Sequence, residues 1–459
     1  MKTPPGWLVA ISLIVVAITP RVLLGLSAPA PMGYVYDFYH EPIQLLYENK
    51  KLPEPADCWQ CYQPPLFTLV GYVIYAAAMQ ATDGNVDQSL QALAWFTTLV
   101  SLAFLALVFL IVQRFVPDLR HLAVVSALLV TLPVVFIASY SIESELFCAT
   151  IMLGAFYLYL RYTDAEAKRT NDADADAQPH WKSWAMVVAI GILAGLAALT
   201  KYSGLLMIIA LGFLFAGRFL AVRTRRRFAH LAIYGGVSAF AGGGDILTNW
   251  LKRDQLFTGN RAWQNVETKG HENLWDWYEF DTFQLSRLLD LMEPDAEPGE
   301  LKRFRAYNRS VLTSHYGQIY TDCSIFSNPT RHGLHKGLYP EKPIPIALIA
   351  TILYAGLIPV LLGILGFFRA LTRPREHLPL FVLTIVFLTF YTAWFLSYPE
   401  WMLKTKYLLT LLPFALILCV GGLRLAKRVH PRVEQGFLGM LWGLVGVCVG
   451  YNVVFAVVG

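Results

Sequence analysis

Residues 92–112 read ALAWFTTLVSLAFLALVFLIV, a run of apolar residues with no charge inside it and Arg114 just beyond its end. A helix needs about 20 consecutive apolar residues to cross the hydrocarbon core of a bilayer. The run therefore predicts a membrane-spanning helix with a cationic end. Further runs of this kind lie on both sides of it, at 7–26, 121–138, 146–162, 183–200, 202–220, 229–247, 344–368, 377–396, 405–423 and 436–458.

The composition agrees with this pattern. Of the 459 residues, 56% are hydrophobic and 15% are charged, whereas about 25% are charged in ordinary soluble domains. There is no P-loop, no dinucleotide-binding glycine motif and no His-Glu-x-x-His zinc motif. The basic residues form short blocks between the apolar runs, so the net charge of +5 does not indicate a nucleic-acid partner. We expect an all-α polytopic membrane protein whose spans contact membrane lipids.

The basic blocks set the expected orientation, since short loops rich in Lys and Arg stay on the cytoplasmic side. The blocks are Arg114/Arg120, Lys168/Arg169, Arg223/Arg225/Arg226/Arg227, Arg369/Arg373/Arg375 and Arg424/Lys427/Arg428/Arg432. All of them lie inside if the shorter run 65–82, which follows Pro64, rests at the outer interface instead of crossing. The prediction is then about eleven transmembrane helices, with 29–64 and 248–343 outside.

The runs divide the chain into three predicted parts. Residues 1–247 form an N-terminal transmembrane catalytic module, which includes the first outer loop, 29–64, and an interfacial helix, 65–82. Residues 248–343 form a small outer cap segment, and 344–459 supply the C-terminal transmembrane helices. Ala28-Pro29-Ala30 also resembles a signal-peptide cleavage site. Cleavage there would leave the first outer loop on the same side.

The predicted first outer loop contains several polar and ionisable residues. It contains Asp37-Phe38-Tyr39-His40-Glu41 and, further along, Gln63-Pro64-Pro65-Leu66. Ionisable side chains next to lipid are costly and therefore mark functional sites by default. Asp37, His40, Glu41 and Gln63 are thus the first candidate site residues.

A second acidic pair, Glu143 and Glu145, lies in a short predicted outer turn between two spans. Glutamates at helix N-termini are favoured by the macrodipole, so one explanation is two solvated carboxylates at a loop end. The other is a second carboxylate that faces the first loop across a cavity at the membrane surface.

Cations lie in two further outer turns. Lys201 and Tyr202 occupy a tight turn between two apolar runs. The ammonium group of Lys201 could bind an anion there, or it could simply extend past the apolar surface into water. Lys404 and Lys406 precede Tyr407 at the start of a later span. Cations at a helix N-terminus oppose the macrodipole, which favours an anionic partner there.

These elements, in this order, resemble the GT-C glycosyltransferases, specifically bacterial relatives of protein O-mannosyltransferase and of the lipid A aminoarabinose transferase. That family has an essential Asp in its first outer loop, a later Pro-Pro element, an acidic motif, a Thr-Lys-x-(Ser/Thr)-Gly turn and a Lys-x-Arg-Tyr element. The matching residues are Asp37 with His40, Gln63-Pro64-Pro65-Leu66, Ser144-Glu145, Thr200 to Gly204, Arg253, and Lys404-Thr405-Lys406-Tyr407. Ser144 stands where the family usually has Asn, and Lys406 where it usually has Arg.

The resemblance implies transfer of a sugar from a polyprenyl-phosphate donor to a lipid, glycan or protein acceptor at the outer face of the bacterial inner membrane. It implies that Asp37 is the general base, that Glu145 is also catalytic and that the anomeric carbon is inverted. A positioned carboxylate takes the proton of a weakly nucleophilic hydroxyl, and cations stabilise the departing phosphate. The remaining candidates bind substrate: His40, Glu41, Glu143, Gln63, Lys201, Tyr202, Arg253, Lys404, Lys406 and Tyr407.

Cofactors and cysteines leave alternatives open. The sequence identifies no cofactor with certainty, and Asp37, His40 and Glu145 have ligand types that suit a divalent cation. Cys58 and Cys61 lie in the first outer loop, where thiols tend to pair; they bond to each other, or one bonds to Cys323. A zinc site with His40 is the alternative. The other cysteines lie in apolar runs and are expected to be core residues: Cys148, Cys419 and Cys448.

Two other functions remain compatible with the sequence. A transporter or flippase of a lipid-linked or anionic substrate would also place charges in a membrane protein, although such proteins often show paired halves that are not evident here. A transferase that uses a lipid pyrophosphate to move an oligosaccharide or a non-sugar group is the second alternative. In the outer segment 248–343, aromatic residues suit a membrane interface or a sugar, and His315 and Tyr316 are candidate acceptor contacts.

Overall fold

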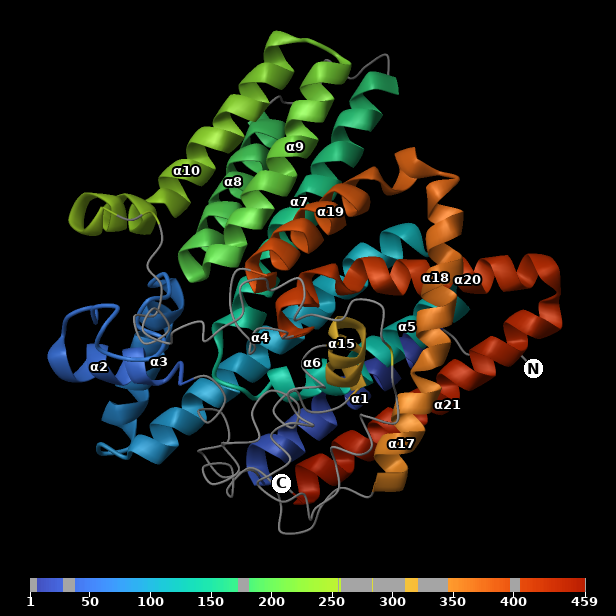
Figure 1. Ribbon diagram of the computed structural model, residues 1–459, viewed down its shortest axis with the longest axis horizontal. Helices are drawn as coiled ribbons and strands as arrows, with labels where there is room; N and C mark the ends of the chain where they lie inside the picture. Colours follow the sequence, from blue (N-terminus) through green and yellow to red (C-terminus); the bar gives the residue numbers. More distant parts are fainter. Residues whose placement is uncertain are drawn as a thin grey trace.

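The computed structural model describes residues 6–27, 38–171, 181–254, 256, 283, 310–320, 346–396 and 405–458. Every element assigned within them is an α-helix or a short 3-10 helix, which confirms the predicted all-α class. Helices α7 (Ser144–Asn171), α8 (Trp181–Thr200), α9 (Leu205–Ala221) and α10 (Arg225–Arg253) lie together at one end of the molecule (Figure 1).

Eight helical stretches among the described residues are long and apolar enough to cross a bilayer. They involve α4 (Val86–Phe115), α7, α8, α9, α17 (Ile346–Ala355) with α18 (Leu357–Leu371), α19 (Pro374–Leu396), α20 (Leu412–Val429) and α21 (Pro431–Val458). The predicted runs at 7–26 and 229–247 correspond to α1 (Gly6–Ser27) and α10. Helix α10 is long, but it carries Asp245 among several glycines and is therefore less apolar than the eight. The number eleven stays a prediction.

The apolar run 121–138 is not the single helix that its hydropathy predicts. It forms α5 (Leu119–Thr131) and α6 (Pro133–Ala138), separated at Leu132. Proline lacks an N–H and clashes with the preceding turn, so Pro133 ends one helix and begins the next. The prediction of one uninterrupted span is therefore wrong here.

Two buried polar side chains satisfy the carbonyl groups at this break, which have no partner within the helix. The Arg21 guanidinium on α1 donates to the Val130 carbonyl, with distances of 3.4 and 3.5 Å. The Asn452 amide on α21 donates to the Thr131 carbonyl at 2.9 Å. The first and last helices of the chain thus hold the broken helix that leads to the turn before α7.

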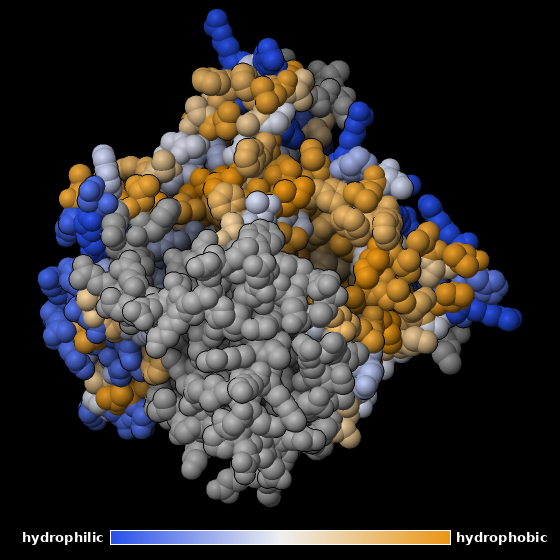
Figure 2. Space-filling view, viewed as in Figure 1, coloured by the Kyte–Doolittle hydropathy of each residue, from blue (hydrophilic) through white to orange (hydrophobic). Residues whose placement is uncertain are grey.

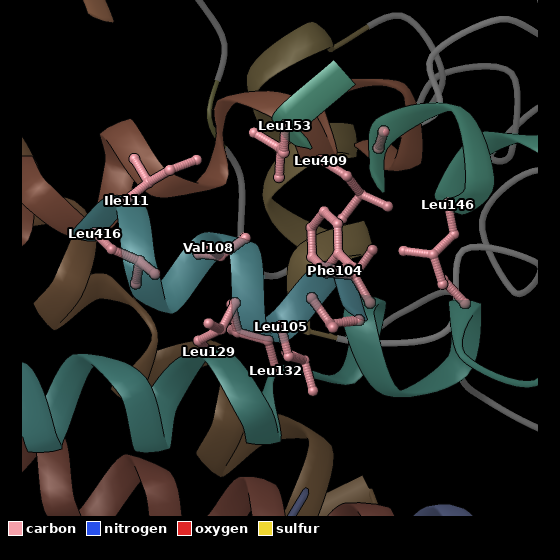
Figure 3. Packing of buried hydrophobic residues seen from close by; sticks show 14 of the residues in the cluster. Phe104, Leu105, Val108, Ile111, Leu129, Leu132, Leu146, Leu153, Leu409 and Leu416 are labelled. Carbon is pink, nitrogen blue, oxygen red and sulfur yellow. The ribbon is translucent and has the colours of Figure 1, made fainter. Parts of the chain in front are cut away.

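Helix α4 lies at the centre of the apolar core. Its residues Phe104, Leu105, Val108 and Ile111 are buried and point toward neighbours from several helices (Figure 3). Those neighbours are Leu129 and Leu132 near the end of α5, Leu146 and Leu153 on α7, and Leu409 and Leu416 near the start of α20. This packing fixes the first turn of α7.

Two short helices, α2 (Glu41–Asn49) and α3 (Leu66–Ala81), lie at the edge of the molecule (Figure 1). Helix α2 packs on α3, where a Cβ at Gly71 would lie 2.4 Å from the Ile43 Cδ1 atom. A larger residue at position 71 would therefore force the Ile43 side chain to move. At 1.5 Å per residue, α3 is about 24 Å long, shorter than the roughly 30 Å hydrocarbon core. This length agrees with the prediction that 65–82 does not cross.

Candidate functional site

The turn that carries Lys201 is built by its neighbours in the sequence. Lys201 has an extended backbone between α8 and the 3-10 helix η3 (Tyr202–Gly204). Its N–H donates to the Ala197 carbonyl at 3.0 Å, and the Gly204 N–H donates to the Lys201 carbonyl at 2.8 Å. A Cβ at Gly204 would lie 2.2 Å from the Ala197 backbone. Only glycine fits this close approach, which explains the last residue of the Thr-Lys-x-Ser-Gly motif.

The turn directs Lys201 into a group of four side chains, which we call the ion-pair cluster: Tyr39, Glu145 and Lys201, which are buried, and Tyr407, which is half-buried. The Lys201 Nζ atom lies 2.6 Å from Glu145 Oε1 and donates to the Tyr39 hydroxyl at 2.7 Å. The Tyr39 hydroxyl in turn donates to Glu145 Oε1 at 2.9 Å. The ring of Tyr407 lies with its centroid 4.8 Å from Nζ, within the range of a cation–π contact.

Burial of the ion-pair cluster decides between the explanations that the sequence left open. Glu143, Glu145 and Lys201 are 3%, 4% and 8% exposed. Solvated loop-end carboxylates and a snorkelling lysine are therefore both wrong. Glu145 also lies in the first turn of α7, where the helix macrodipole stabilises a carboxylate.

A second network begins at the next residue, Tyr202. Its hydroxyl donates to Asp245 Oδ2 at 3.0 Å and accepts from the Asn249 amide at 3.1 Å. Arg253 donates to the Asn249 side-chain carbonyl and forms an ion pair with Glu54 in the predicted first outer loop. Asp245, Asn249 and Arg253 are four residues apart and so share one face of α10. Tyr202 and Arg253, both predicted, are thereby joined to each other and to the loop that carries Glu54.

The predicted residues His40, Glu41 and Gln63 lie near the ion-pair cluster in the chain but have different surroundings. His40 is buried at the start of α2, and this burial lowers the pKa of its imidazole to about 4, so the ring is neutral at pH 7. Glu41 lines a surface groove with Phe38. The Gln63 amide donates to the Gln60 side-chain carbonyl at 3.4 Å.

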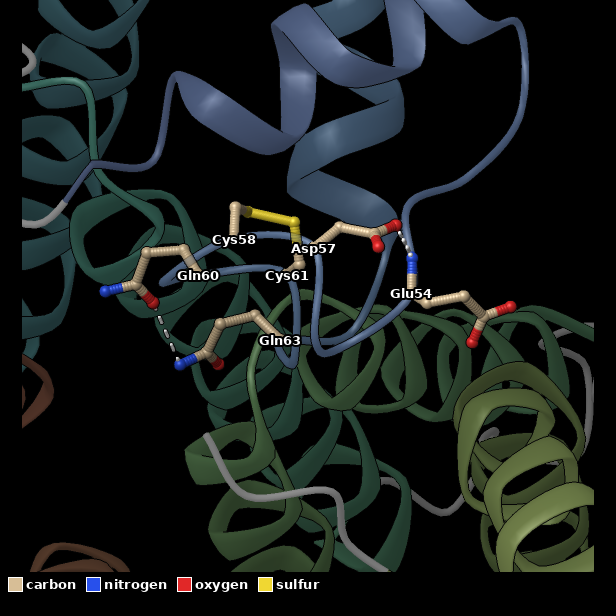
Figure 4. The surroundings of a disulfide bond; sticks show 6 residues. All are labelled: Glu54, Asp57, Cys58, Gln60, Cys61 and Gln63. Atoms are coloured by element: carbon tan, nitrogen blue, oxygen red, sulfur yellow. Dashed lines mark hydrogen bonds between the residues drawn. A yellow bond between two sulfur atoms is a disulfide. The ribbon is translucent and has the colours of Figure 1, made fainter. Parts of the chain in front are cut away.

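Cys58 and Cys61 form a disulfide in the loop before α3 (Figure 4). This is one of the two pairings that the sequence predicts. A bonded pair has no thiolates for zinc, so the alternative zinc site with His40 is wrong. Cys323 lies outside the described residues. The three cysteines predicted in the core are buried: Cys148, Cys419 and Cys448.

Some predicted site residues cannot be placed. Asp37 and Lys404 lie outside the described residues, as does the side chain of Lys406. Within the described ranges, no group of three or more His, Cys, Asp or Glu side chains could hold a metal ion. The divalent-cation site suggested for Asp37, His40 and Glu145 includes a residue outside those ranges and stays a prediction.

The candidate acceptor contacts His315 and Tyr316 lie on α15 (Val311–Tyr320). The Nδ1 atom of His315 lies 3.0 Å from Thr405 Oγ1, and the Tyr316 hydroxyl donates to the Leu353 carbonyl. These contacts hold α15 against the C-terminal helices. A role of either side chain toward an acceptor stays untested.

Four residues of the two networks were not predicted: Tyr39, Asp245, Asn249 and Glu54. Tyr39 stands inside the acidic motif of the first loop, between Asp37 and His40. Asp245 is an ionisable residue in an apolar, glycine-rich run, which is itself a signal of function in a membrane protein. Asn249 carries no such signal, because an amide near a helix end is common on any protein surface.

Comparison with known proteins defines the class. The apo crystal structure of ArnT from Cupriavidus metallidurans is similar to this chain with a TM-score of 0.50 and 13% identity, over 99% of this chain and 78% of that one. The fold is therefore that of the GT-C membrane glycosyltransferases, and the protein is an integral, multi-pass membrane protein. Residues 69–234 match the family model of the dolichyl-phosphate-mannose-protein mannosyltransferases. The predicted resemblance is confirmed.

More distant structures extend this list. The apo oligosaccharyltransferase from Archaeoglobus fulgidus has a TM-score of 0.47 and 14% identity, over 97% of this chain and 55% of that one. ArnT from Cupriavidus metallidurans bound to undecaprenyl phosphate has a TM-score of 0.38 and 13% identity, over 93% and 80%. No curated protein matches the chain at a significant level.

Proposed function

We propose that this protein transfers a sugar from a polyprenyl-phosphate donor to an acceptor at the outer face of the bacterial plasma membrane. The observation that carries the proposal is the buried Glu145–Lys201 pair, which positions a cation at the predicted outer end of α8. The matched family is described by a lipid-phosphate sugar, dolichyl-phosphate-mannose. The basic blocks of the inner loops support the outward orientation of this end.

Lys201 is the proposed contact of the donor phosphate. When the bond between the anomeric carbon and the phosphate oxygen breaks, the oxygen keeps the electron pair and the phosphate gains negative charge. A cation held in place before the reaction stabilises that charge without reorganisation. Arg253, Lys404 and Lys406 are the further proposed cations. The Tyr407 ring lies against Lys201, and Tyr202 is joined to Arg253 through Asn249.

Asp37 is the proposed general base, which takes the proton of the acceptor hydroxyl as its oxygen attacks the anomeric carbon. Asp37 precedes Tyr39 by two residues, and the Tyr39 hydroxyl contacts both members of the Glu145–Lys201 pair. Chain connectivity therefore supports a base close to the phosphate-binding cation. One attack from the side opposite the phosphate inverts the anomeric carbon. Glu145 holds Lys201, while neutral His40 and the polar side chains of Glu41, Glu143 and Gln63 orient the substrates.

The three predicted parts of the chain have distinct proposed roles. Residues 1–247 carry the pair and the base, and 344–459 supply Tyr407. Residues 248–343 are the proposed outer cap.

The test uses the purified protein in nanodiscs with a panel of polyprenyl-phosphate sugars. Release of polyprenyl phosphate is followed by mass spectrometry. We expect Asp37→Asn to lower turnover by about 10²- to 10⁴-fold, the usual contribution of a general base, while binding of polyprenyl phosphate is retained. Asp83→Asn, in the turn after α3, is the matched control and keeps turnover.

Two results would count against the proposal in different ways. Near-normal turnover by Asp37→Asn would remove Asp37 as the base but leave the activity. Failure of the unaltered protein to bind polyprenyl phosphate would remove the lipid-phosphate donor itself.

A further inference from the structure

We propose that the predicted cytoplasmic ends of α18 and α20 form a binding site for the headgroup phosphate of an anionic phospholipid. Four arginines define this site, which we call the arginine cluster: Arg369, Arg373, Arg424 and Arg428. They belong to two of the basic blocks that the sequence places on the cytoplasmic side. The inference does not depend on the proposed function.

The two helices that carry the cluster cross in direct backbone contact (Figure 1). A Cβ at Gly366 on α18 would collide with the Leu418 carbonyl oxygen on α20. A Cβ at Gly422 on α20 would collide with the Leu362 carbonyl oxygen on α18. Small residues let transmembrane helices approach this closely. The crossing therefore fixes the positions of the side chains just beyond it.

Two arginines continue the helix faces that meet at this crossing. Arg369 follows Gly366 by three residues in the last turn of α18, so the two share one face of that helix. Arg428 follows Gly421, which also packs on Gly366, by seven residues in the last turn of α20. Seven residues are close to two helical turns, so this pair shares a face as well. The close approach of the helices thus brings two like charges to the same region.

The cluster gathers more positive than negative charge. Arg369 lies within electrostatic range of Arg373, Arg424 and Arg428, and of the carboxylate of Glu376. Glu376 forms an ion pair with Arg373 at 3.4 Å. Like charges repel, so the other three guanidinium groups favour an added anion.

Arg369 has an unused hydrogen-bond donor inside this group. Its Nη1 atom is buried and, within the part of the chain that the structure describes, has no hydrogen-bond partner. Arginines at other predicted cytoplasmic helix ends have carboxylate partners: Arg114 lies 2.6 Å from Asp164, and Arg226 lies 2.7 Å from Glu166. A buried donor without a partner is costly, so Arg369 indicates a missing acceptor.

The surroundings of the cluster favour a lipid over a soluble anion. Phe368 and Leu371, on either side of Arg369 along α18, are 62% and 50% exposed. Figure 2 shows a hydrophobic surface over this part of the molecule, at the right of the view, with hydrophilic residues at its edge. An anionic phospholipid presents a phosphate next to its acyl chains, which matches guanidinium groups beside an apolar surface.

The cluster is separate from the proposed site of the donor phosphate. Tyr407, which lies against Lys201, begins a 23-residue stretch long enough to cross a bilayer, and Arg428 lies near the other end of that stretch. At 1.5 Å per residue the stretch is about 35 Å long, more than the roughly 30 Å hydrocarbon core. A lipid bound to the arginine cluster therefore does not occupy the donor site.

The test uses the delipidated protein in a neutral detergent and native mass spectrometry, which counts the lipids that stay bound. The probes are dioleoyl phosphatidylglycerol and dioleoyl phosphatidylcholine, which have the same acyl chains, and inorganic phosphate is the soluble anion. We expect phosphatidylglycerol to bind at least about 10-fold more tightly than phosphatidylcholine. Millimolar inorganic phosphate should not displace it.

Variants assign this preference to the cluster. Arg369→Gln with Arg428→Gln should weaken binding of phosphatidylglycerol at least about 10-fold, and Arg428→Gln alone, at an exposed side chain, should weaken it in part. Arg223→Gln with Arg225→Gln removes two exposed arginines near the start of α10 and the same net charge. It is the matched control and keeps the preference. Without lipid, the cluster variant should unfold at the same temperature as the unaltered protein or at a higher one, because repulsion between the arginines is relieved.

Four outcomes would overturn the inference. Equal affinity for the two lipids would remove the preference for an anionic headgroup, and equal losses in the cluster variant and the control variant would reduce it to net charge. Displacement of phosphatidylglycerol by inorganic phosphate would assign the cluster to a soluble anion. A lower unfolding temperature of the cluster variant without lipid would give the arginines a structural role instead.

Discussion

The ion-pair cluster and the groove begin at neighbouring residues and handle charge in opposite ways. In the cluster, Glu145 is almost completely buried and bonds to Lys201 and Tyr39. In the groove, Glu48 and Asp57 are exposed and have no Lys or Arg beside them among the lining residues. Burial of a charge is costly unless it is paired, whereas an exposed charge stays hydrated. The cluster therefore holds its cation in position, whereas Glu48 and Asp57 lie at the surface of the groove.

The segment between the two regions has an unusual backbone. Phe38 has a φ of 57°, in the left-handed region that bulky residues rarely adopt. A residue held there costs about 1–3 kcal/mol. The surrounding packing must offset this cost, because the kink places Phe38 on the groove and Tyr39 in the cluster.

The largest expected effect comes from removing the cation of the ion-pair cluster. Lys201→Met leaves the Glu145 carboxylate buried without its cation, so we expect a loss of about 3–5 kcal/mol in the free energy of unfolding. Thermal unfolding of the protein in detergent, followed by tryptophan fluorescence, measures the change. The double variant Lys201→Met/Glu145→Gln should recover much of the loss, because no unpaired charge remains. No recovery in the double variant would show that the pair is not what stabilises this region.

The second effect concerns His40, which lies between the two regions. Its pKa is about 4 in the folded protein, below the ordinary value of 6.5, because burial disfavours the charged ring. Between these values the unfolded chain binds the proton and the folded one does not, so stability is complete above pH 6.5 and falls as the pH drops toward 4. The limit of this loss is on the order of 3 kcal/mol.

Unfolding profiles from pH 7.5 to 4.5 test this prediction. His40→Gln should flatten the profile relative to the unaltered protein. Parallel profiles for His40→Gln and the unaltered protein would contradict the burial of a neutral ring.

The smallest expected effect lies in the groove. Glu48→Gln removes an exposed carboxylate, and such surface changes usually alter stability by less than about 0.5 kcal/mol. The same thermal unfolding assay applies. A large stabilisation or destabilisation would mean that Glu48 has a strong partner, and the contrast between the two regions would then not hold.

Much of the fold could be predicted from the sequence, because the length and apolarity of each run are local properties. The helices α4, α7, α8 and α9 lie where the apolar runs are. The hydropathy of 121–138 does not show the break at Pro133. The effect of proline on the backbone is local, so the break itself could have been predicted from the sequence. The carbonyl groups freed there depend on Arg21 and Asn452, at opposite ends of the chain. No local pattern indicates such partners.

The candidate site was predicted less completely. The motifs identified Glu145, Lys201, Tyr202, Arg253 and Tyr407 as site residues, but their roles stay proposals. Their pairing could not be read from the motifs, because Glu145 and Lys201 are separated by a full pair of helices. Glu54, which pairs with Arg253, also had no signal in the sequence, since a glutamate in a polar loop is ordinary.

The sequence by itself determined the class of this protein: an all-helical membrane protein with its polar motifs in the order of the GT-C glycosyltransferases. Apolar length and motif order are properties of the linear chain, so no contact is needed to read them. The tertiary structure decided which charges are compensated and which are open. It joined Tyr39 and Lys201 to Glu145 and left Glu48 and Asp57 exposed, because burial and pairing depend on residues far apart in the chain.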